Sequence, residues 1–365
     1  MRIGIDARLS GAKHAGIGRY TQNLIIELLK QNKRDKYVCF FYDNDQASEV
    51  LGSYFNNKNI KVVITPIRHY TFQEQQKLPK LFQDENLDLL HVPHFNIPIL
   101  YKGKLVITIH DLLWHEYKGG SVTTLNPITY MLKYLFYRLV TRIAVHKAEK
   151  IIVPAETIKQ TVIRFYPKTK DKIVVTKEGA KIADRKKLKN LPKLKKTFLY
   201  VGSLYPHKNL KLVLQALSSI PKYKLLIAGS RNIFQDKVKQ YIKYKEIEEQ
   251  VEFLGYVPDN DLAKLYQQVT ALVQPSFSEG FGLTGVEAMS FGTSVLASDI
   301  PIFREIYQNA AFYFSPHSVA SFIQAVHALE QNQDKVNAEG ISLSKNYSWE
   351  QMATQTIDIY KSVLK

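Results

Sequence analysis

The stretch 275–292, PSFSEGFGLTGVEAMSFG, constrains the fold most, because it places a glycine turn between a strand and a helix. The preceding apolar run, ALVQPS, is typical of a buried strand, and LTGVEAMSFG is expected to form a helix that ends at Gly292. The turn between them is EGFG, residues 279–282. Its glycines let the backbone approach a phosphate closely, and a helix N-terminus attracts anions. The sequence therefore predicts an anion site at this turn.

Two carboxylates bracket the turn, Glu279 within it and Glu287 in the helix that follows. Eight helical positions span about 12 Å, which is similar to the distance from the ribose to the sugar of a sugar nucleotide. Carboxylates are also good acceptors for sugar hydroxyls. The alternative is that both side chains are ordinary solvated charges, because Glu is rarely buried. The residues alone leave both interpretations open.

The pattern of strand, turn and helix occurs in both halves of the chain. The alternating run RIGIDAR (2–8) predicts a first strand, followed by the loop SGAKHAGIGRY and the helix TQNLIIELLK. The run TFLYVGSLYPHKNLKLVLQAL (197–217) repeats the pattern after a Lys-rich, Pro-containing stretch. Most apolar runs are nearly continuous and β-branched, as in parallel sheets that are covered on both faces. We expect an α/β protein of two Rossmann-like domains with a boundary near residue 180.

Composition limits the kinds of binding partner and the cellular compartment that we expect for this chain. The net charge of +17 favours an anionic partner, which would be a nucleic acid, an anionic membrane surface or a phosphorylated substrate, although such charge also promotes solubility. The Lys-rich stretch lacks interleaved aromatic residues, so we expect no nucleic acid. The chain has a single cysteine, no apolar run of about 18 residues and no secretory signal at its start. We expect a cytoplasmic protein that stays in solution or binds the inner face of the membrane.

Several polar residues follow predicted strands of the N-terminal half. His91 and His94 lie in LDLLHVPHF, and His110 and Asp111 lie in KLVITIHDLLWHEY. Ligands of open α/β sheets bind at the carboxyl ends of the strands, so these residues are candidates for binding a substrate. A lone histidine is more often structural, and for His91 and His94 this alternative stays open.

Two segments, 43–45 and 259–261, match the short metal motif D-x-D. The first follows a predicted strand as a turn, and the second precedes a helix, where Asp is a good N-cap. Because so short a motif arises readily by chance, we expect no metal ion and no other cofactor.

The stretch 121–150 is predicted to be an amphipathic, basic helix, in which tyrosines and leucines alternate with lysines and arginines. Such a helix can dock on a membrane surface near a lipid-linked substrate. It can equally pack on the N-terminal sheet with its cations in water. The sequence leaves both possibilities open.

The segment EGFGLTGVEAMSFGTSVLAS closely resembles the motif of retaining GT-B glycosyltransferases of family 4, and the similarity to the bacterial polysaccharide mannosyltransferase-like group extends over nearly the whole chain. The resemblance implies two Rossmann-like domains that face each other across a cleft. Residues 1–180 with the C-terminal helix 348–365 would bind the acceptor, and residues 181–347 would bind the donor.

The resemblance also implies a reaction. A hexose of the mannose or glucose type would move from a nucleotide-diphospho-sugar to a glycan or lipid-linked acceptor during cell-surface polysaccharide assembly, with retained configuration and without metal. The alternative function is a catalytically inactive adaptor that keeps the fold and binds an anionic membrane or nucleic-acid surface.

The family pattern assigns roles to individual residues. Glu279 would contact the donor sugar, Lys208 would pair with the diphosphate and His110 would bind the sugar, which makes these three the catalytic candidates. Glu287 would bind the ribose hydroxyls. The other donor-binding candidates are Gly16, Gly18, Ser203, Arg231, Tyr256, Val257, Gly280, Phe281, Gly282, Leu283 and Thr284, and the acceptor-binding candidates are Arg19, His91, His94 and Asp111.

Two of these positions depart from the family. Thr284 stands where the family commonly has Pro, and Ser203 stands where many members have a phosphate-binding Arg. Arg231, which follows the run KLLIAGS, is a candidate to replace that cation.

Overall fold

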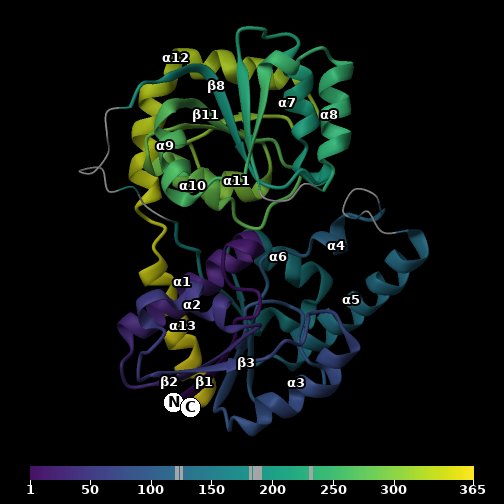
Figure 1. The fold of residues 1–365 in the computed structure, drawn as a ribbon, viewed down its shortest axis with the longest axis vertical. Coiled ribbons are helices and arrows are strands. Elements are labelled where there is room, and N and C mark those ends of the chain that lie inside the picture. The colour runs from purple at the N-terminus through teal and green to yellow at the C-terminus, as the bar shows by residue number, and fades with distance from the viewer. Residues whose placement is uncertain (120–122, 124–125, 181–182, 184–190, 230–232) are drawn as a thin grey trace. The chain divides into compact units, whose positions relative to one another are not determined.

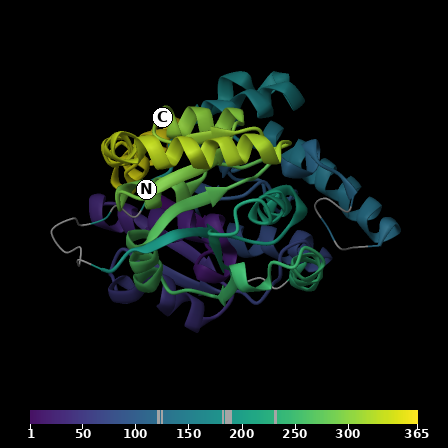
Figure 2. The same cartoon turned by 90° about the horizontal axis from the view of Figure 1, so that it is seen from above.

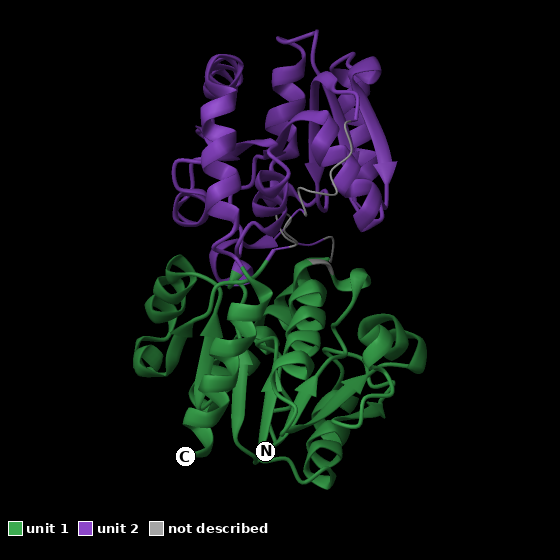
Figure 3. Cartoon of the chain, turned by 90° about the vertical axis from the view of Figure 1, so that its left-hand side faces the viewer, with its two compact units in different colours: residues 1–112, 126–179, 348–365 green, residues 113–125, 180–347 purple. Residues whose placement is uncertain are grey.

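The computed structural model describes residues 1–119, 123, 126–180, 183, 191–229 and 233–365 (Figure 1). The chain divides into two compact units, shown in Figure 3. The first unit contains residues 1–112, 126–179 and 348–365, and the second contains residues 113–125 and 180–347. The sequence did not indicate that residues 113–125 would group with the second unit, because they directly continue the strand that leads to His110.

Each unit is built on one parallel sheet. The first sheet has the order β3 (Ile60–Ile64), β2 (Lys36–Phe41), β1 (Arg2–Asp6), β4 (Leu89–Val92), β5 (Leu105–Thr108), β6 (Lys150–Val153) and β7 (Ile173–Val175). The second has the order β10 (Val251–Gly255), β9 (Lys224–Ala228), β8 (Leu194–Val201), β11 (Val269–Gln274), β12 (Ser294–Ser298) and β13 (Phe312–Phe314). The predicted fold class, with two Rossmann-like parallel sheets, is confirmed.

Helices cover both sheets. The first unit contains α1 (Ala15–Gln31), α2 (Asn44–Leu51), α3 (Phe72–Asp84), α5 (Pro127–Lys147), α6 (Glu156–Phe165) and α13 (Trp349–Leu364). The second contains α4 (Leu113–Glu116), α7 (Leu210–Leu217), α8 (Gln235–Tyr244), α9 (Asp259–Gln268), α10 (Leu283–Ser290), α11 (Pro301–Tyr307) and the long α12 (Val319–Ser344), which Figure 2 shows along its length.

The core of the first unit joins segments that are far apart in the sequence. Side chains of α1, α2 and α13 pack together against β1 and β2, with Leu24, Phe41 and Met352 fully buried. In β4 and β5 every residue is buried, as expected for the centre of a sheet covered on both faces. Polar side chains that contact a ligand are therefore expected just beyond the carboxyl ends of these strands.

The prediction that Gly16 and Gly18 lie in a loop is wrong. Helix α1 begins at Ala15, so Gly16 and Gly18 lie in its first turn. The amide of Gly11 donates to the Gly18 carbonyl at 3.2 Å, and a Cβ on Gly18 would collide with the Gly11 carbonyl oxygen. This close approach of two backbone segments favours a helical glycine, although glycine by itself disfavours a helix.

Three histidines of the first unit have side chains that are almost fully shielded from solvent, and their pKa values are low. Burial lowers the pKa of His69 and His91 to about 3, and it also places the pKa of His94 well below its ordinary value. An unfolded histidine has a pKa of about 6.5. Between these two values the unfolded chain binds protons that the folded chain does not, so stability is lost as the pH falls through this window.

We predict that His91→Gln reduces the pH dependence of unfolding by about one proton, or about 1.4 kcal/mol per pH unit, between pH 6 and pH 4. Urea unfolding at a series of pH values measures this slope separately from the overall loss of stability. His327→Gln is the control, because the His327 side chain is 63% exposed. A slope that His91→Gln leaves unchanged would contradict a neutral, buried His91.

Candidate active site

The central turn lies between β11 and α10 in the second unit. Gly282 is the residue before the first turn of α10 and has a φ of +92°, a conformation that favours glycine. A Cβ there would lie 2.9 Å from Phe303 Cε1 and would collide with the Tyr307 hydroxyl. Gly292 follows α10 with a φ of +77°, as expected for a glycine that ends a helix. The predicted strand, turn and helix are therefore present.

Buried hydrogen bonds hold the turn in place. The Tyr307 hydroxyl lies 2.6 Å from the Gly282 carbonyl oxygen and 2.5 Å from Gln274 Oε1. The other end of this amide, Gln274 Nε2, donates to the Thr284 hydroxyl at 2.9 Å. Thr284 thus joins the start of α10 to the end of β11 through a side chain, which the Pro common in the family could not do.

Glu279 and Lys208 form an ion pair beside this helix start. Lys208 Nζ lies 2.7 Å from Glu279 Oε1, and the Ser276 hydroxyl donates to the same oxygen at 2.8 Å. Burial acts to raise the pKa of Glu279, but the attraction to Lys208 and the hydrogen bonds from Lys208 and Ser276 outweigh it and lower the pKa below its ordinary value. Glu279 is therefore a carboxylate that can accept hydrogen bonds.

The segment that carries Lys208 is tied to the central loop. The Phe277 amide donates to the His207 carbonyl at 2.9 Å. Asn209, which adopts a left-handed conformation between Lys208 and α7, donates from Nδ2 to the Pro316 carbonyl at 2.8 Å. These bonds fix the backbone on both sides of Lys208.

Glu287 lies within α10 and is only 2% exposed. The alternative interpretation of Glu287 as a charge on a solvated helix face is therefore wrong. Glu279 is not an isolated loop charge either, because its side chain is 17% exposed and paired with Lys208.

The remaining donor candidates of the second unit have mixed surroundings. The Ser203 carbonyl accepts from the Tyr200 hydroxyl at 2.5 Å, just after β8. Tyr256 follows β10 and is 60% exposed, and Val257 is partly buried. Arg231, the expected replacement for a missing phosphate-binding Arg, lies outside the described residues.

His110 lies just beyond β5 in the first unit and contacts a carboxylate that the sequence analysis missed. Its Nδ1 is 2.8 Å from Glu178 Oε1, which follows β7. The ring of Tyr20 contacts the His110 imidazole edge to face, with centroids 4.7 Å apart. No motif links His110 to Glu178, and only the pairing of β5, β6 and β7 brings them together.

The expected acceptor role of His91 is not supported by its position. His91 lies within β4, fully buried, with Nδ1 2.6 Å from the Tyr360 hydroxyl and Nε2 2.9 Å from the Thr108 hydroxyl. Because both ring nitrogens are used inside the core, His91 is a structural histidine that links β4 to β5 and α13.

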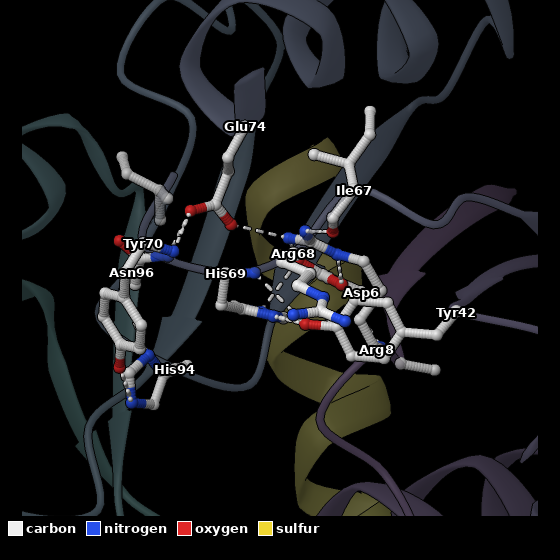
Figure 4. Close-up of polar contacts among 12 residues, drawn as sticks. Asp6, Arg8, Tyr42, Ile67, Arg68, His69, Tyr70, Glu74, His94 and Asn96 are labelled. Atoms are coloured by element: carbon white, nitrogen blue, oxygen red, sulfur yellow. Dashed lines mark hydrogen bonds and ion pairs between the residues drawn. The ribbon is translucent and has the colours of Figure 1, made fainter. Parts of the chain in front are cut away.

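His94 adjoins a buried charge cluster at the end of β1 (Figure 4). The Arg8 guanidinium donates to both Asp6 oxygens, at 2.8 and 2.7 Å, and to Glu74 Oε1 at 2.9 Å. Glu74 Oε2 also accepts from Asn96 Nδ2 at 2.8 Å. The His94 side chain lies beside Asn96, whose backbone amide donates to His94 Nδ1 at 3.1 Å. His94 is only 7% exposed, so its position does not support the predicted role in binding an acceptor.

The other first-unit candidates lie nearer the surface. Arg19 and Asp111 are partly exposed, and Gly16 is exposed on the first turn of α1.

In the second unit a pocket of about 680 Å³ lies beside the loop that carries Glu279, between Phe277, Tyr117 and the ends of β12 and β13. Aromatic rings line it together with the Asp299 carboxylate and Ser315.

Comparison with known proteins assigns the family. Residues 14–182 match Glycosyltransferase Family 4, and residues 181–342 match Glycosyl transferases group 1. The O-antigen chain mannosyltransferase B of Escherichia coli is 31% identical over 380 residues, which cover 95% of this chain and 96% of that protein. The chain belongs to glycosyltransferase family 4. It is an enzyme of the glycosyltransferase class, as the family resemblance of the central turn implied.

Two further similarities concern this glycosyltransferase. The O-antigen chain mannosyltransferase RfbU of Salmonella typhimurium is 26% identical over 337 residues, covering 90% of each chain. The structure of the Anabaena protein HepE in complex with UDP and glucose superposes with a TM-score of 0.73 at 17% identity, covering 99% of each chain. At that identity the similarity shows the fold, which is the GT-B fold expected from the sequence.

The described part of this glycosyltransferase contains neither a metal-binding cluster nor a membrane-spanning helix. No three His, Cys, Asp or Glu side chains of the described residues gather closely enough to hold a metal ion. Among the same residues, no helix combines the length and the apolar composition needed to cross a membrane.

We predict that Gly285→Ala destabilises the turn by about 1–3 kcal/mol, because the added Cβ would collide with the Tyr307 hydroxyl and Gln274 Oε1. Alanine normally improves a helix by about 0.5–1 kcal/mol relative to glycine, so a net loss identifies the collision as the larger effect. Gly16→Ala is the matched control, because a Cβ at Gly16 has nothing within 4 Å. Urea unfolding of both variants measures the difference, and equal stabilities would contradict this packing.

Proposed function

We propose that this enzyme transfers a hexose, of the mannose or glucose type, from a nucleotide-diphospho-sugar to a glycan or lipid-linked acceptor in cell-surface polysaccharide assembly. The observation that carries this proposal is the pair of Glu279 and Lys208 beside the start of α10, 2.7 Å apart. The names of the two O-antigen mannosyltransferases favour mannose and a glycan acceptor. The UDP and glucose in the HepE structure favour a nucleotide-sugar donor.

The ion pair suits a site where phosphate charge must be neutralised and a sugar oriented. Lys208 would stabilise the negative charge that develops on the departing diphosphate, and the amides at the start of α10 would add hydrogen bonds. Donor phosphate competing for Lys208 would leave Glu279 free to accept hydrogen bonds from sugar hydroxyls. Both tasks are performed by groups of the protein itself, so we propose a reaction without metal or another cofactor.

We further propose that the transfer retains the anomeric configuration. The bond from the anomeric carbon to the diphosphate oxygen breaks, and the acceptor oxygen bonds to that carbon on the same face. The acceptor's hydroxyl proton passes to the leaving diphosphate. No enzyme nucleophile takes part, and His110 serves as a hydrogen-bonding partner of the sugar. Exclusion of water during transfer would limit hydrolysis of the donor.

The first test is a thermal-shift panel with UDP, GDP, ADP and dTDP in EDTA. A nucleotide at a hundredfold excess over its Kd stabilises the folded protein by about 2.7 kcal/mol. We predict that one nucleotide stabilises the wild type, and that Glu287→Ala loses this shift because the ribose loses its acceptor.

Glu249→Ala is the control for this test, since Glu249 is an exposed carboxylate of the same unit. A wild type that no nucleotide stabilises would refute a sugar-nucleotide donor and favour the inactive adaptor. The assignment of the site to these residues is wrong if Lys208→Ala, Glu279→Ala and His110→Ala all keep the wild-type rate of donor turnover.

A second proposal concerns where in the cell the enzyme acts, and it rests on one face of α5. The inner face of α5 packs on the first unit through Tyr137, Val140 and Ala144, as the packed-helix interpretation expected. The outer face is apolar as well. Five large side chains at helical spacing are between 52% and 77% exposed, and these are Ile128, Met131, Leu132, Leu135 and Leu139.

We propose that this outer face of α5 docks on an anionic membrane surface, where a lipid-linked acceptor would reside. A contiguous exposed apolar stripe is unusual for a protein surface in water. Lys133 and Arg142 are exposed on the same helix, and the whole chain carries a net charge of +17. Apolar insertion combined with cationic attraction is the chemistry by which helices lie on anionic lipid.

We predict that Leu132→Asp with Leu135→Asp weakens binding to phosphatidylglycerol vesicles by at least about tenfold, because two inserted side chains are lost and two anions are added. Vesicle flotation at low and high salt measures binding. Phe72→Asp with Tyr244→Asp is the control, since these two large apolar side chains are at least as exposed, at 75% and 76%, and lie on other elements. Equal binding by both double variants would refute docking through α5.

A further inference from the structure

The His110 imidazole is held in one orientation at the carboxyl end of β5. Its Nδ1 lies 2.8 Å from Glu178 Oε1, and the two side chains are only 10% and 5% exposed. The Tyr20 ring contacts the imidazole edge to face. The Tyr20 hydroxyl in turn lies 3.2 Å from the Thr108 hydroxyl, at the end of β5. The ring is therefore fixed by a carboxylate on one side and by an aromatic ring packed into the core.

The second nitrogen of His110 has no such partner. His110 Nε2 is buried and makes no hydrogen bond within the described residues. Buried polar atoms in folded proteins are nearly always hydrogen-bonded, so an unsatisfied nitrogen on a side chain that is nine-tenths buried points to a missing ligand group. His91, one strand away, shows the contrast, because both of its nitrogens are satisfied inside the core.

We propose that Glu178 is a positioning residue for His110, and that it fixes the neutral tautomer whose Nε2 accepts a hydrogen bond from a hydroxyl of the transferred sugar. A carboxylate can only accept, so the His110 proton that faces Glu178 must be on Nδ1. The lone pair of the neutral ring is then on Nε2. The reverse tautomer would bring two lone pairs to within 2.8 Å of each other.

This inference rests on the proposed transfer of a sugar, and it adds a chemical role for the pair of His110 and Glu178. A sugar hydroxyl that donates to Nε2 is held in a single direction. The negative charge of Glu178 behind the ring makes Nε2 a better acceptor. It also favours positive charge on the sugar as the diphosphate departs. No proton moves to His110 and no bond to it forms, so the pair acts through orientation and electrostatics.

The test uses the full chain with Glu178→Gln, Glu178→Asp and, as the matched control, Glu149→Gln. Glu149 is an exposed carboxylate of the same unit, so the control makes the same change of charge. The tautomer of His110 is measured from ¹⁵N spectra of histidine-labelled protein, with His110→Asn to assign its signals. Turnover is measured as hydrolysis of GDP-mannose, UDP-glucose and UDP-galactose, which needs no knowledge of the acceptor.

We expect His110 in the wild type to carry its proton on Nδ1, with Nε2 unprotonated. Glu178→Gln should mix the two tautomers and lower kcat by at least about tenfold, while KM for the donor stays within about twofold. Glu178→Asp should recover part of kcat, and Glu149→Gln should match the wild type. A purely structural Glu178 would lower stability without changing the tautomer or separating kcat from KM.

Two results would overturn the inference: a wild-type His110 protonated at Nε2, or a Glu178→Gln variant with the wild-type kcat. The proposed function fails separately, if the wild type turns over none of the three donors and no nucleotide of the thermal-shift panel stabilises it. In that case the tautomer alone decides whether Glu178 positions His110.

Discussion

Both sheets of this glycosyltransferase are parallel and covered by helices, and this constraint determines where polar chemistry can occur. A polar group within such a sheet must be satisfied inside the core. His91 shows the solution, since Thr108 and Tyr360 take both of its nitrogens. The Arg8 guanidinium does the same for Asp6 and Glu74 at the end of β1. Removing one partner of such a buried ion pair typically lowers the free energy of unfolding by about 3–5 kcal/mol, so these residues are needed for stability.

The groups with spare hydrogen-bonding capacity lie just beyond the strand ends. His110 follows β5, Glu279 follows β11, and Lys208 precedes α7 after β8. Two of these side chains are oriented by a buried neighbour: Glu178 contacts His110, and Ser276 contacts Glu279. The same architecture thus fixes the ring of His110 and the carboxylate of Glu279, although the two lie in different units.

The sequence predicted the elements that depend on local chemistry. The glycine turn, the helix ending before Gly292 and the two parallel sheets all follow from residue types at short spacing, and these predictions are confirmed. It failed where distant segments meet. The helical start of α1 depends on Gly18 packing against Gly11, and the position of His91 depends on a tyrosine near the end of the chain. Glu178 was missed because β6 separates its strand from that of His110 in the sheet and no motif joins them.

The threonine at the start of α10 would change the balance of forces at the anion site proposed there. The first amides of a helix have no partner within the helix, and a proline at that place would supply none. Thr284 keeps its amide hydrogen, and Gln274 holds its side chain. Ser203, meanwhile, provides no positive charge where many relatives have an arginine. If the start of α10 binds the donor's phosphates as we propose, backbone dipoles there would supply part of the attraction that a cation supplies in those relatives. Because fixed dipoles at short range are screened less by dissolved ions than a mobile surface charge, binding of the phosphates would then be less sensitive to ionic strength.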